Sequence, residues 1–154
     1  SIYLLELSHQ VYKHENNNNI YKLLISSIKK INEEYDSGII TAILELKLLE
    51  YLGIKPIIDK CVNCNSTNDI VTISSYKGGY LCKNCVGNET IFNVKTLKLI
   101  RMFYYVDIDK ITKLEISPNI KKELNLFINE YYDRYAGLYL KSKSYLEEFS
   151  SLKE

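Results

Sequence analysis

The chain has 154 residues, enough for one domain with a sizeable hydrophobic core. Its 20 Lys and Arg residues are balanced by 19 Asp and Glu residues, so bulk electrostatic attraction to nucleic acid or to a membrane is not predicted. No apolar run approaches the roughly twenty residues needed to cross a bilayer, and nothing resembles a signal peptide. These features indicate an intracellular, soluble protein.

The beginning of the chain suggests that something precedes it. The first residue is Ser1, the only methionine is Met102, and an apolar helical pattern starts at once. We therefore expect a fragment whose N-terminal domain has been removed. Apolar positions from Tyr3 to Val11 recur with helical spacing, which predicts a first helix, and the run Asn16 to Asn19 ends it.

Two further helices are predicted before the first cysteine. The segment Ile20 to Tyr35 has a single apolar stripe opposite its lysines and is typical of an amphipathic helix. The segment Ile39 to Leu52 is apolar nearly all the way round, which predicts the buried centre of the domain. Gly53 is placed for a left-handed C-terminal cap, and Pro56 prevents continuation. Within this helix, Glu45 is either a catalytic carboxylate or, as is far more common, the partner of a cation or backbone donor.

Two CxxC pairs dominate the middle of the chain: Cys61 with Cys64, and Cys82 with Cys85. A two-residue gap lets both thiolates of a pair turn toward one ion, and a hairpin-length spacer brings the second pair round to complete a tetrahedron. Four thiolates close the coordination shell, so we expect a structural zinc ion rather than a catalytic one. Disulfides and a thioredoxin-like redox pair are the alternatives. The lack of a signal peptide and of a βαβ pattern disfavours both.

The spacer between the cysteine pairs has the pattern of a short β-ribbon. Ile70 to Ser75 alternates apolar and polar residues, and Lys77-Gly78-Gly79 is a turn signal. Tyr80-Leu81 then leads back into Cys82. A hairpin that carries a cysteine pair at each side of its open end is therefore predicted.

Helical patterns resume after the second cysteine pair. Asn93 can cap a helix that continues to Tyr104, and Asp109 to Leu114 predicts another turn or two. Ser117-Pro118 is a start signal, a cap followed by proline at the first helical position. Apolar positions from Ile120 to Leu138 keep one face for roughly five turns, which predicts the longest helix of the chain. A last short helix is expected at Tyr145 to Phe149.

Together these elements predict a mainly α fold, a helical bundle with an inserted small four-cysteine zinc-ribbon β-hairpin at residues 59–88. The sequence has no Gly-rich phosphate loop, no justified Ser/His/Asp arrangement and no deaminase-type zinc motif. His9 and His14 are interpreted as surface or half-buried residues, because four cysteines already satisfy an ion. An enzyme is not predicted.

The junction of the central helix and the cysteine segment resembles the C-terminal domain of the RecO family of DNA repair and recombination proteins. The resemblance is carried by Glu45-Leu-Lys-Leu-Leu-Glu-Tyr-Leu-Gly-Ile-Lys-Pro56, Cys61-x-x-Cys64, Ser75-x-x-Gly78-Gly79-x-Leu81-Cys82 and Cys85. The end of the chain is similar to that family's closing helix through Tyr131, Arg134, Leu140-Lys141-Ser142 and Tyr145-Leu146. The likeness covers practically the whole chain, residues 1–154.

The resemblance implies the helical, zinc-bearing half of a recombination mediator that follows an N-terminal OB-fold. Such proteins bind single-stranded and duplex DNA, anneal complementary strands, associate with RecR, and help to load RecA onto DNA coated by single-stranded-DNA-binding protein. The acidic, Phe-ended tail of the coating protein docks on the family's helical domain. The resemblance also implies a cytoplasmic, nucleoid-associated protein and assigns Cys61, Cys64, Cys82 and Cys85 as zinc ligands.

Basic residues near the ribbon and on the last helix are candidates for contacts with DNA or a partner: Lys60, Lys77, Lys83, Arg134, Lys141 and Lys143. Such side chains can neutralise phosphate without reading sequence, and Lys77 is well presented at a hairpin tip. Arg134 and Lys141 lie near one side of the last helix, where they could receive a tail carboxylate. Each residue of this set can equally be a cation that only solvates the surface.

The alternative function is a zinc-ribbon adaptor that binds only protein partners, with no affinity for DNA or for the coating protein's tail. An enzyme that uses the ion ranks last. If the mediator interpretation holds, the balanced charge predicts weak, salt-dependent DNA binding by this chain alone. We also expect Cys61→Ser or Cys82→Ser to disorder residues 58–90 while much of the helical core persists.

Overall fold

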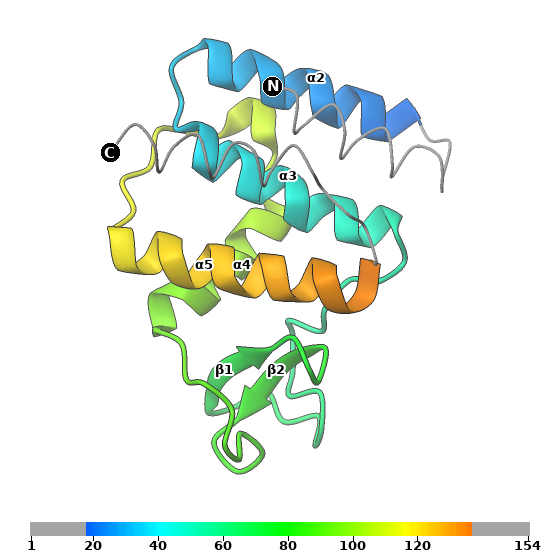
Figure 1. Ribbon diagram of the computed structural model, residues 1–154, viewed down its shortest axis with the longest axis vertical. Coiled ribbons are helices and arrows are strands. Elements are labelled where there is room, and N and C mark those ends of the chain that lie inside the picture. Colours follow the sequence, from blue (N-terminus) through cyan, green and yellow to red (C-terminus); the bar gives the residue numbers. More distant parts are fainter. Residues whose placement is uncertain (1–17, 137–154) are drawn as a thin grey trace.

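The computed structural model describes residues 18–136, which form a set of packed helices with a small hairpin at one end (Figure 1). The helices are α2 (Asn18–Asn32), α3 (Ser37–Tyr51), α4 (Val94–Tyr105) and α5 (Pro118–Tyr131), with a short 3-10 helix η1 (Ile108–Lys110) and a π-helical turn η2 (Tyr132–Ala136). The strands are β1 (Ile70–Ser74) and β2 (Gly79–Cys82), which pair antiparallel. The predicted combination of helices with a small inserted hairpin is confirmed. Within residues 18–136, none of the helices has the length and apolarity to span a membrane.

Helix α3 is the buried centre of this arrangement, as its all-round apolar sequence predicts. It contacts α2, α4 and α5, and its residues Leu44, Leu46 and Leu48 are fully buried. The helix starts at an N-cap, where the Asp36 carboxylate accepts hydrogen bonds from the backbone N–H groups of Gly38 at 2.8 Å and Ile39 at 3.2 Å. Burial of each such leucine stabilises the fold by roughly 1.5 to 3 kcal/mol, so α3 contributes strongly to the packing energy.

The end of α3 confirms the predicted glycine cap. Gly53 has a φ of 74°, and its N–H donates to the Glu50 carbonyl while the next N–H, of Ile54, donates to Leu49. These two bonds form a Schellman motif, which satisfies carbonyls that the helix itself leaves open. The chain then turns sharply away from the bundle toward the hairpin.

The hairpin is packed onto the helices through one of its faces. Ile58, Ile73 and Tyr80 belong to the same buried cluster as the helical core. The Tyr80 hydroxyl donates to the Leu97 carbonyl of α4 at 3.0 Å, and Arg101 of α4 donates to the Ile58 carbonyl at 2.8 Å. The ribbon is therefore attached to α4 by packing and by hydrogen bonds, more closely than the expectation of separate disorder in residues 58–90 assumes.

Gly79 is required where the segment before the cysteines meets the hairpin. The Ile57 backbone donates to Gly78 and accepts from Tyr80, and Ile57 forms a parallel bridge with Gly79. A Cβ atom on Gly79 would lie 2.3 Å from the Ile57 carbonyl oxygen, closer than any real contact. The second glycine of the turn signal thus serves a close backbone approach rather than the turn itself.

The helices after the hairpin begin where the sequence predicts. Asn93 caps α4 by accepting from the Lys95 N–H, and Ser117 caps α5, with Pro118 as its first residue. The expected turn in 109–114 is observed slightly earlier, as η1. Helices predicted at 3–11 and 145–149 lie outside the described residues.

Helix α5 differs from the single regular helix that the sequence predicts to Leu138. It has 14 residues, one fewer than α2 and α3, and the chain passes at Tyr132 into the π-helical turn η2. Two neighbouring tyrosines are directed inward here: Tyr131 donates its hydroxyl to the Ile54 carbonyl and Tyr132 to the Glu45 carbonyl. A wider turn accommodates both, because adjacent residues of a regular α-helix lie about 100° apart around the axis. The predicted end at Leu138 falls outside the described residues.

We expect Leu44→Ala to lower the free energy of unfolding by about 2 to 5 kcal/mol, because it opens a cavity at a fully buried site. The matched control is Leu126→Ala, the same change at a leucine of α5 that is 47% exposed, with an expected effect within about 0.5 kcal/mol. Urea unfolding followed by circular dichroism measures both. Equal losses in the two variants would contradict the central burial of α3.

Candidate metal centre and binding surfaces

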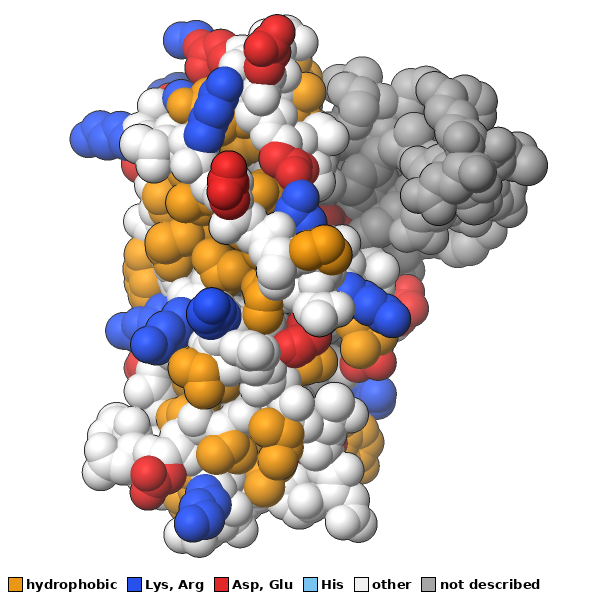
Figure 2. Space-filling model, turned by 90° about the vertical axis from the view of Figure 1, so that its left-hand side faces the viewer, with side chains coloured by type: hydrophobic (Ala, Val, Ile, Leu, Met, Phe, Trp, Pro, Cys, Tyr) orange, Lys and Arg blue, Asp and Glu red, His pale blue; other side chains and the backbone are white. Residues whose placement is uncertain are grey.

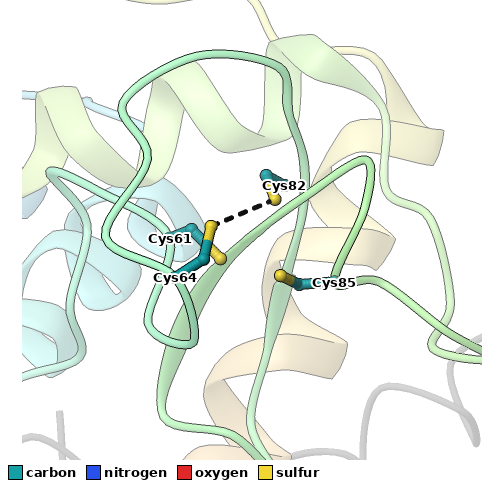
Figure 3. Close-up of side chains that lie close together, drawn as sticks. All are labelled: Cys61, Cys64, Cys82 and Cys85. Atoms are coloured by element: carbon teal, nitrogen blue, oxygen red, sulfur yellow. Dashed lines mark hydrogen bonds between the residues drawn. The ribbon is translucent and has the colours of Figure 1, made fainter.

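The four cysteines meet at the open end of the hairpin (Figure 3). Cys61 and Cys64 lie in the loop before β1, Cys82 is the last residue of β2, and Cys85 lies in the turn that follows. Their sulfur atoms are all within 4.8 Å of one another, and the Sγ atoms of Cys64 and Cys82 are 3.6 Å apart. The two CxxC pairs are thus brought together as their spacing predicts.

Backbone hydrogen bonds hold both cysteine loops in place. The Asn65 N–H donates to the Cys61 carbonyl and the Cys85 N–H to the Cys82 carbonyl, each at 3.0 Å. The Val62 N–H donates across to the Tyr80 carbonyl at 2.8 Å, which ties the first loop to β2. The Sγ positions are consequently set by the hairpin rather than by side-chain rotation alone.

The cysteine cluster is unevenly buried. Cys61 and Cys82 are buried, Cys85 is half-buried and Cys64 is exposed. Burial opposes ionisation of Cys61, but backbone N–H groups of Cys64, Cys82 and Asn63 directed at its sulfur lower the pKa of that thiol to about 6. The pKa of Cys64 is raised to about 11. A hydrogen bond from the Ser66 backbone lowers this pKa, but the combined effect of the Cys82 side chain, burial and the side chains of Cys61 and Cys85 raises it by more.

This geometry fits a zinc ion. A Zn–S bond of about 2.3 Å in a tetrahedron places neighbouring sulfurs roughly 3.8 Å apart, close to the spacing of the Cys64 and Cys82 sulfurs. Four sulfur ligands suit a closed structural site and leave no position for a reacting water. The Asn63 side-chain amide also donates to the Cys85 sulfur at 3.3 Å, the kind of outer contact that orients a ligand.

Glu45 takes the structural role that its position on α3 favours. The residue is 2% exposed, and its backbone carbonyl accepts the hydroxyl of Tyr132. Burial raises the pKa of Tyr132 well above its usual value, and the nearby Glu45 raises it further. A carboxylate enclosed by the bundle has no route to a substrate, so Glu45 belongs to the packing of α3 against the end of α5.

The predicted basic residues fall into separate groups. Lys77 at the hairpin tip and Arg134 in η2 belong to one surface, because the charged groups of both lie within 5.3 Å of the ring centroid of Tyr76. Lys60 and Lys83 lie in the two cysteine loops, each next to a cysteine. Lys141 and Lys143 lie outside the described residues. Of the four within residues 18–136, Lys77 and Arg134 are thus brought together, with the exposed ring of Tyr76 beneath both.

A groove that the sequence does not reveal lies between α4 and the segment leading into α5. It has a volume of about 340 Å³, and its apolar lining is Leu99, Met102, Leu114, Ile116 and Ile120. Lys95 and Lys98 of α4 also line it, together with Glu115. On the side of the molecule where α5 begins, hydrophobic side chains gather in the middle with Lys and Arg side chains next to them (Figure 2). The only sign of this groove in the sequence is that Leu99 and Met102 are apolar but lie outside the buried stripe of α4.

Comparison with known proteins identifies the family. A family model described as "Recombination protein O C terminal" matches residues 2–144, nearly the whole chain. The chain belongs to the RecO family. This confirms the resemblance seen at the junction of α3 and the cysteine segment. No solved structure gives a significant match.

Curated relatives carry the same family name. DNA repair protein RecO of Halalkalibacterium halodurans is 34% identical over 154 residues, which covers 97% of this chain and 61% of that protein. The RecO proteins of Bacillus pumilus and Bacillus subtilis are 33% and 32% identical, and each alignment covers 54% of the relative. The chain thus spans a little over half the length of the relatives it matches. Their names support a role in DNA repair.

We expect the chain to bind one zinc ion and Cys82→Ser to lose it, because removal of one thiolate opens the coordination shell. Hydrogen exchange should then accelerate most in residues 61–69 and 82–87. Ile58, Ile73 and Tyr80 pack with the helices, so we expect a smaller increase in the exchange rate in the rest of residues 58–90. Zinc content and amide exchange measure both effects.

The matched control is Lys83→Ser, which alters the neighbouring residue in the same loop and should retain full zinc. Full zinc content and unchanged exchange in Cys82→Ser would contradict the four-sulfur site. Loss of protection throughout α3 in that variant would show that the ion supports the whole fold.

Proposed function

We propose that this chain is the helical, zinc-bearing part of a recombination mediator in the RecF pathway of DNA repair, which follows an N-terminal OB-fold in the whole protein. In this role it binds DNA, RecR and the tail of single-stranded-DNA-binding protein, and it supports strand annealing and RecA loading. Membership of the RecO family and the names of the curated relatives support the proposal. The work is binding rather than bond-making, with Cys61, Cys64, Cys82 and Cys85 as ligands of a structural zinc ion.

The observation that carries the proposal is the groove beside α4. Its lining is mainly apolar, Met102 is 40% exposed, and the charged residues that line it are two lysines, Lys95 and Lys98, and one carboxylate, Glu115. An acidic peptide that ends in phenylalanine matches this chemistry, because the ring can be buried against the apolar lining while carboxylates approach Lys95 and Lys98. Methionine adapts readily to an inserted ring, which suits Met102 to the wall of such a site.

A zinc-ribbon adaptor that binds only protein partners is the second candidate. The groove is compatible with it, since an apolar groove with basic edges can receive other acidic peptides. The pair of cations at Tyr76 favours the mediator, because Lys77 and Arg134 offer charge for a phosphate backbone away from the groove. Measurable affinity for DNA separates the two candidates.

We expect the chain to bind a labelled peptide that copies the coating protein's acidic tail, and to lose this binding when the terminal phenylalanine is removed. Met102→Glu should weaken binding roughly tenfold or more, because it places a carboxylate in the apolar lining opposite an acidic ligand. Fluorescence anisotropy measures the dissociation constants.

Ile25→Glu is the matched control, since it makes a comparable change at a 48% exposed apolar residue of α2. It should bind the peptide as the unaltered chain does. If the two variants bind alike, or if the peptide without phenylalanine binds equally well, the groove is not the tail site.

A further inference from the structure

Tyr76 at the tip of the hairpin is an exposed aromatic ring beside two cations. Its side chain is 63% exposed, and both cations lie over the ring: the Lys77 Nζ atom is 5.3 Å and the Arg134 Cζ atom 5.2 Å from the ring centroid. Both cations are themselves exposed and come from different elements, the hairpin turn and η2. An exposed ring with adjacent positive charge is the combination with which proteins hold unpaired nucleotides.

We infer that the hairpin tip binds single-stranded nucleic acid by stacking an unpaired base on Tyr76, with the flanking phosphates held by Lys77 and Arg134. This inference rests on the proposed DNA-binding function and assigns that function a place and a mode. We call this surface, made of Tyr76, Lys77 and Arg134, the Tyr76 platform.

The platform is held on a fixed turn. The Lys77 N–H donates to the Ser74 hydroxyl at 3.0 Å, and the Gly78 N–H donates to the Ser74 carbonyl at 2.9 Å. The Tyr135 hydroxyl donates to the Tyr76 carbonyl at 3.0 Å, which fastens the turn to η2. The turn is therefore ordered before any ligand arrives, and binding requires only that an exposed cation move off the ring face that the base takes.

A hollow next to Tyr76 has room and chemistry for a base. It has a volume of about 270 Å³ between β1, the segment 88–92 and α5, and it is lined in part by Ser74, Ser75, Asn88 and Thr90. Hydroxyl and amide groups can form hydrogen bonds with any base edge, so no strong sequence preference is expected.

Two carboxylates in the hollow decide which part of a nucleotide enters it. Glu89 and Glu130 line the hollow, and Glu130 accepts a hydrogen bond from Ser75 at 3.2 Å. Like charges repel, so the two carboxylates, which outnumber the one lining cation Arg134, disfavour a phosphate inside, while Lys77, which does not line the hollow, attracts a phosphate outside it. The neutral base therefore faces the hollow and the tyrosine ring, and the charged backbone stays outside. Because bases of a duplex are stacked on each other, this arrangement selects a single strand.

The test is the affinity of the zinc-loaded 154-residue chain for a short, fluorescently labelled oligo(dT) strand. We expect Tyr76→Ala to raise the dissociation constant roughly five- to a hundredfold through loss of one base stack. Tyr76→Phe keeps the ring and should bind within about twofold of the unaltered chain. Tyr21→Ala is the control: Tyr21 is 62% exposed on α2, and no Lys or Arg among residues 18–136 is found over its ring.

The salt dependence separates stacking from charge. Tyr76→Ala should leave the slope of log affinity against log salt unchanged, whereas Lys77→Ala should reduce its magnitude by about 0.7. The chain has no tryptophan, so Tyr76→Trp introduces a unique fluorophore whose emission should be quenched when a base stacks on it.

The outcomes distinguish this inference from the function on which it rests. If oligo(dT) binds the unaltered chain and Tyr76→Ala equally well, or leaves the Tyr76→Trp emission unchanged, the platform is overturned while DNA binding stands. If the unaltered chain does not bind oligo(dT) at all, the Tyr76 platform and the proposed DNA binding by this chain are both overturned. Loss of affinity in Tyr76→Ala but not in Tyr21→Ala or Tyr76→Phe supports stacking on this ring.

Discussion

Helix α3 must be covered on every side, because a helix that is apolar all round has no face that water can solvate at low cost. The bundle satisfies this requirement with α2, α4 and α5, each of which contacts α3. The hairpin packs on α4, and α4 packs on α3. The position of the hairpin therefore depends indirectly on the burial of α3. The glycine cap at Gly53 contributes by directing the chain out of α3 toward the segment that bridges to Gly79.

Helix α4 connects the two surfaces to which we assign binding. Its buried face meets α3, Leu97 and Arg101 hold the ribbon through hydrogen bonds, and Leu99 and Met102 line the groove. The groove includes Ile120 near the start of α5, while the hollow beside Tyr76 includes Glu130 near its end. Ten residues of α-helix separate these two positions by about 15 Å. A peptide and a strand can therefore occupy the two surfaces without direct contact.

Local chemistry explains what could be predicted from the sequence. The caps at Asn93 and Ser117 and the left-handed Gly53 depend on residues only a few positions apart. The metal cluster was predictable because the two-residue gap within each CxxC pair is visible in the sequence. The all-round apolar pattern likewise identified α3 as the centre. The resemblance at Glu45 to Pro56 added the family, which no spacing argument supplies.

The remaining features depend on contacts between distant segments, which a single sequence does not specify. The groove forms only where α4 meets residues 114–120, and the need for glycine at position 79 comes from the Ile57 backbone. Tyr76 is one of fourteen tyrosines, so composition hides its exposure and its neighbour Arg134, which lies 58 residues away in sequence (134 − 76). The π-helical turn follows from the partners of Tyr131 and Tyr132, both more than seventy residues away.

The arrangement of two separate binding surfaces on one scaffold is tested most directly by titrating labelled oligo(dT) into the chain already saturated with the acidic, Phe-ended peptide. Separate surfaces predict that the peptide stays bound and that the affinity for the strand changes by no more than about twofold, because no ligand atoms meet. Displacement of the peptide by the strand would show that both ligands use one surface, and it would contradict the assignment of the groove to the tail and of the hairpin tip to the strand.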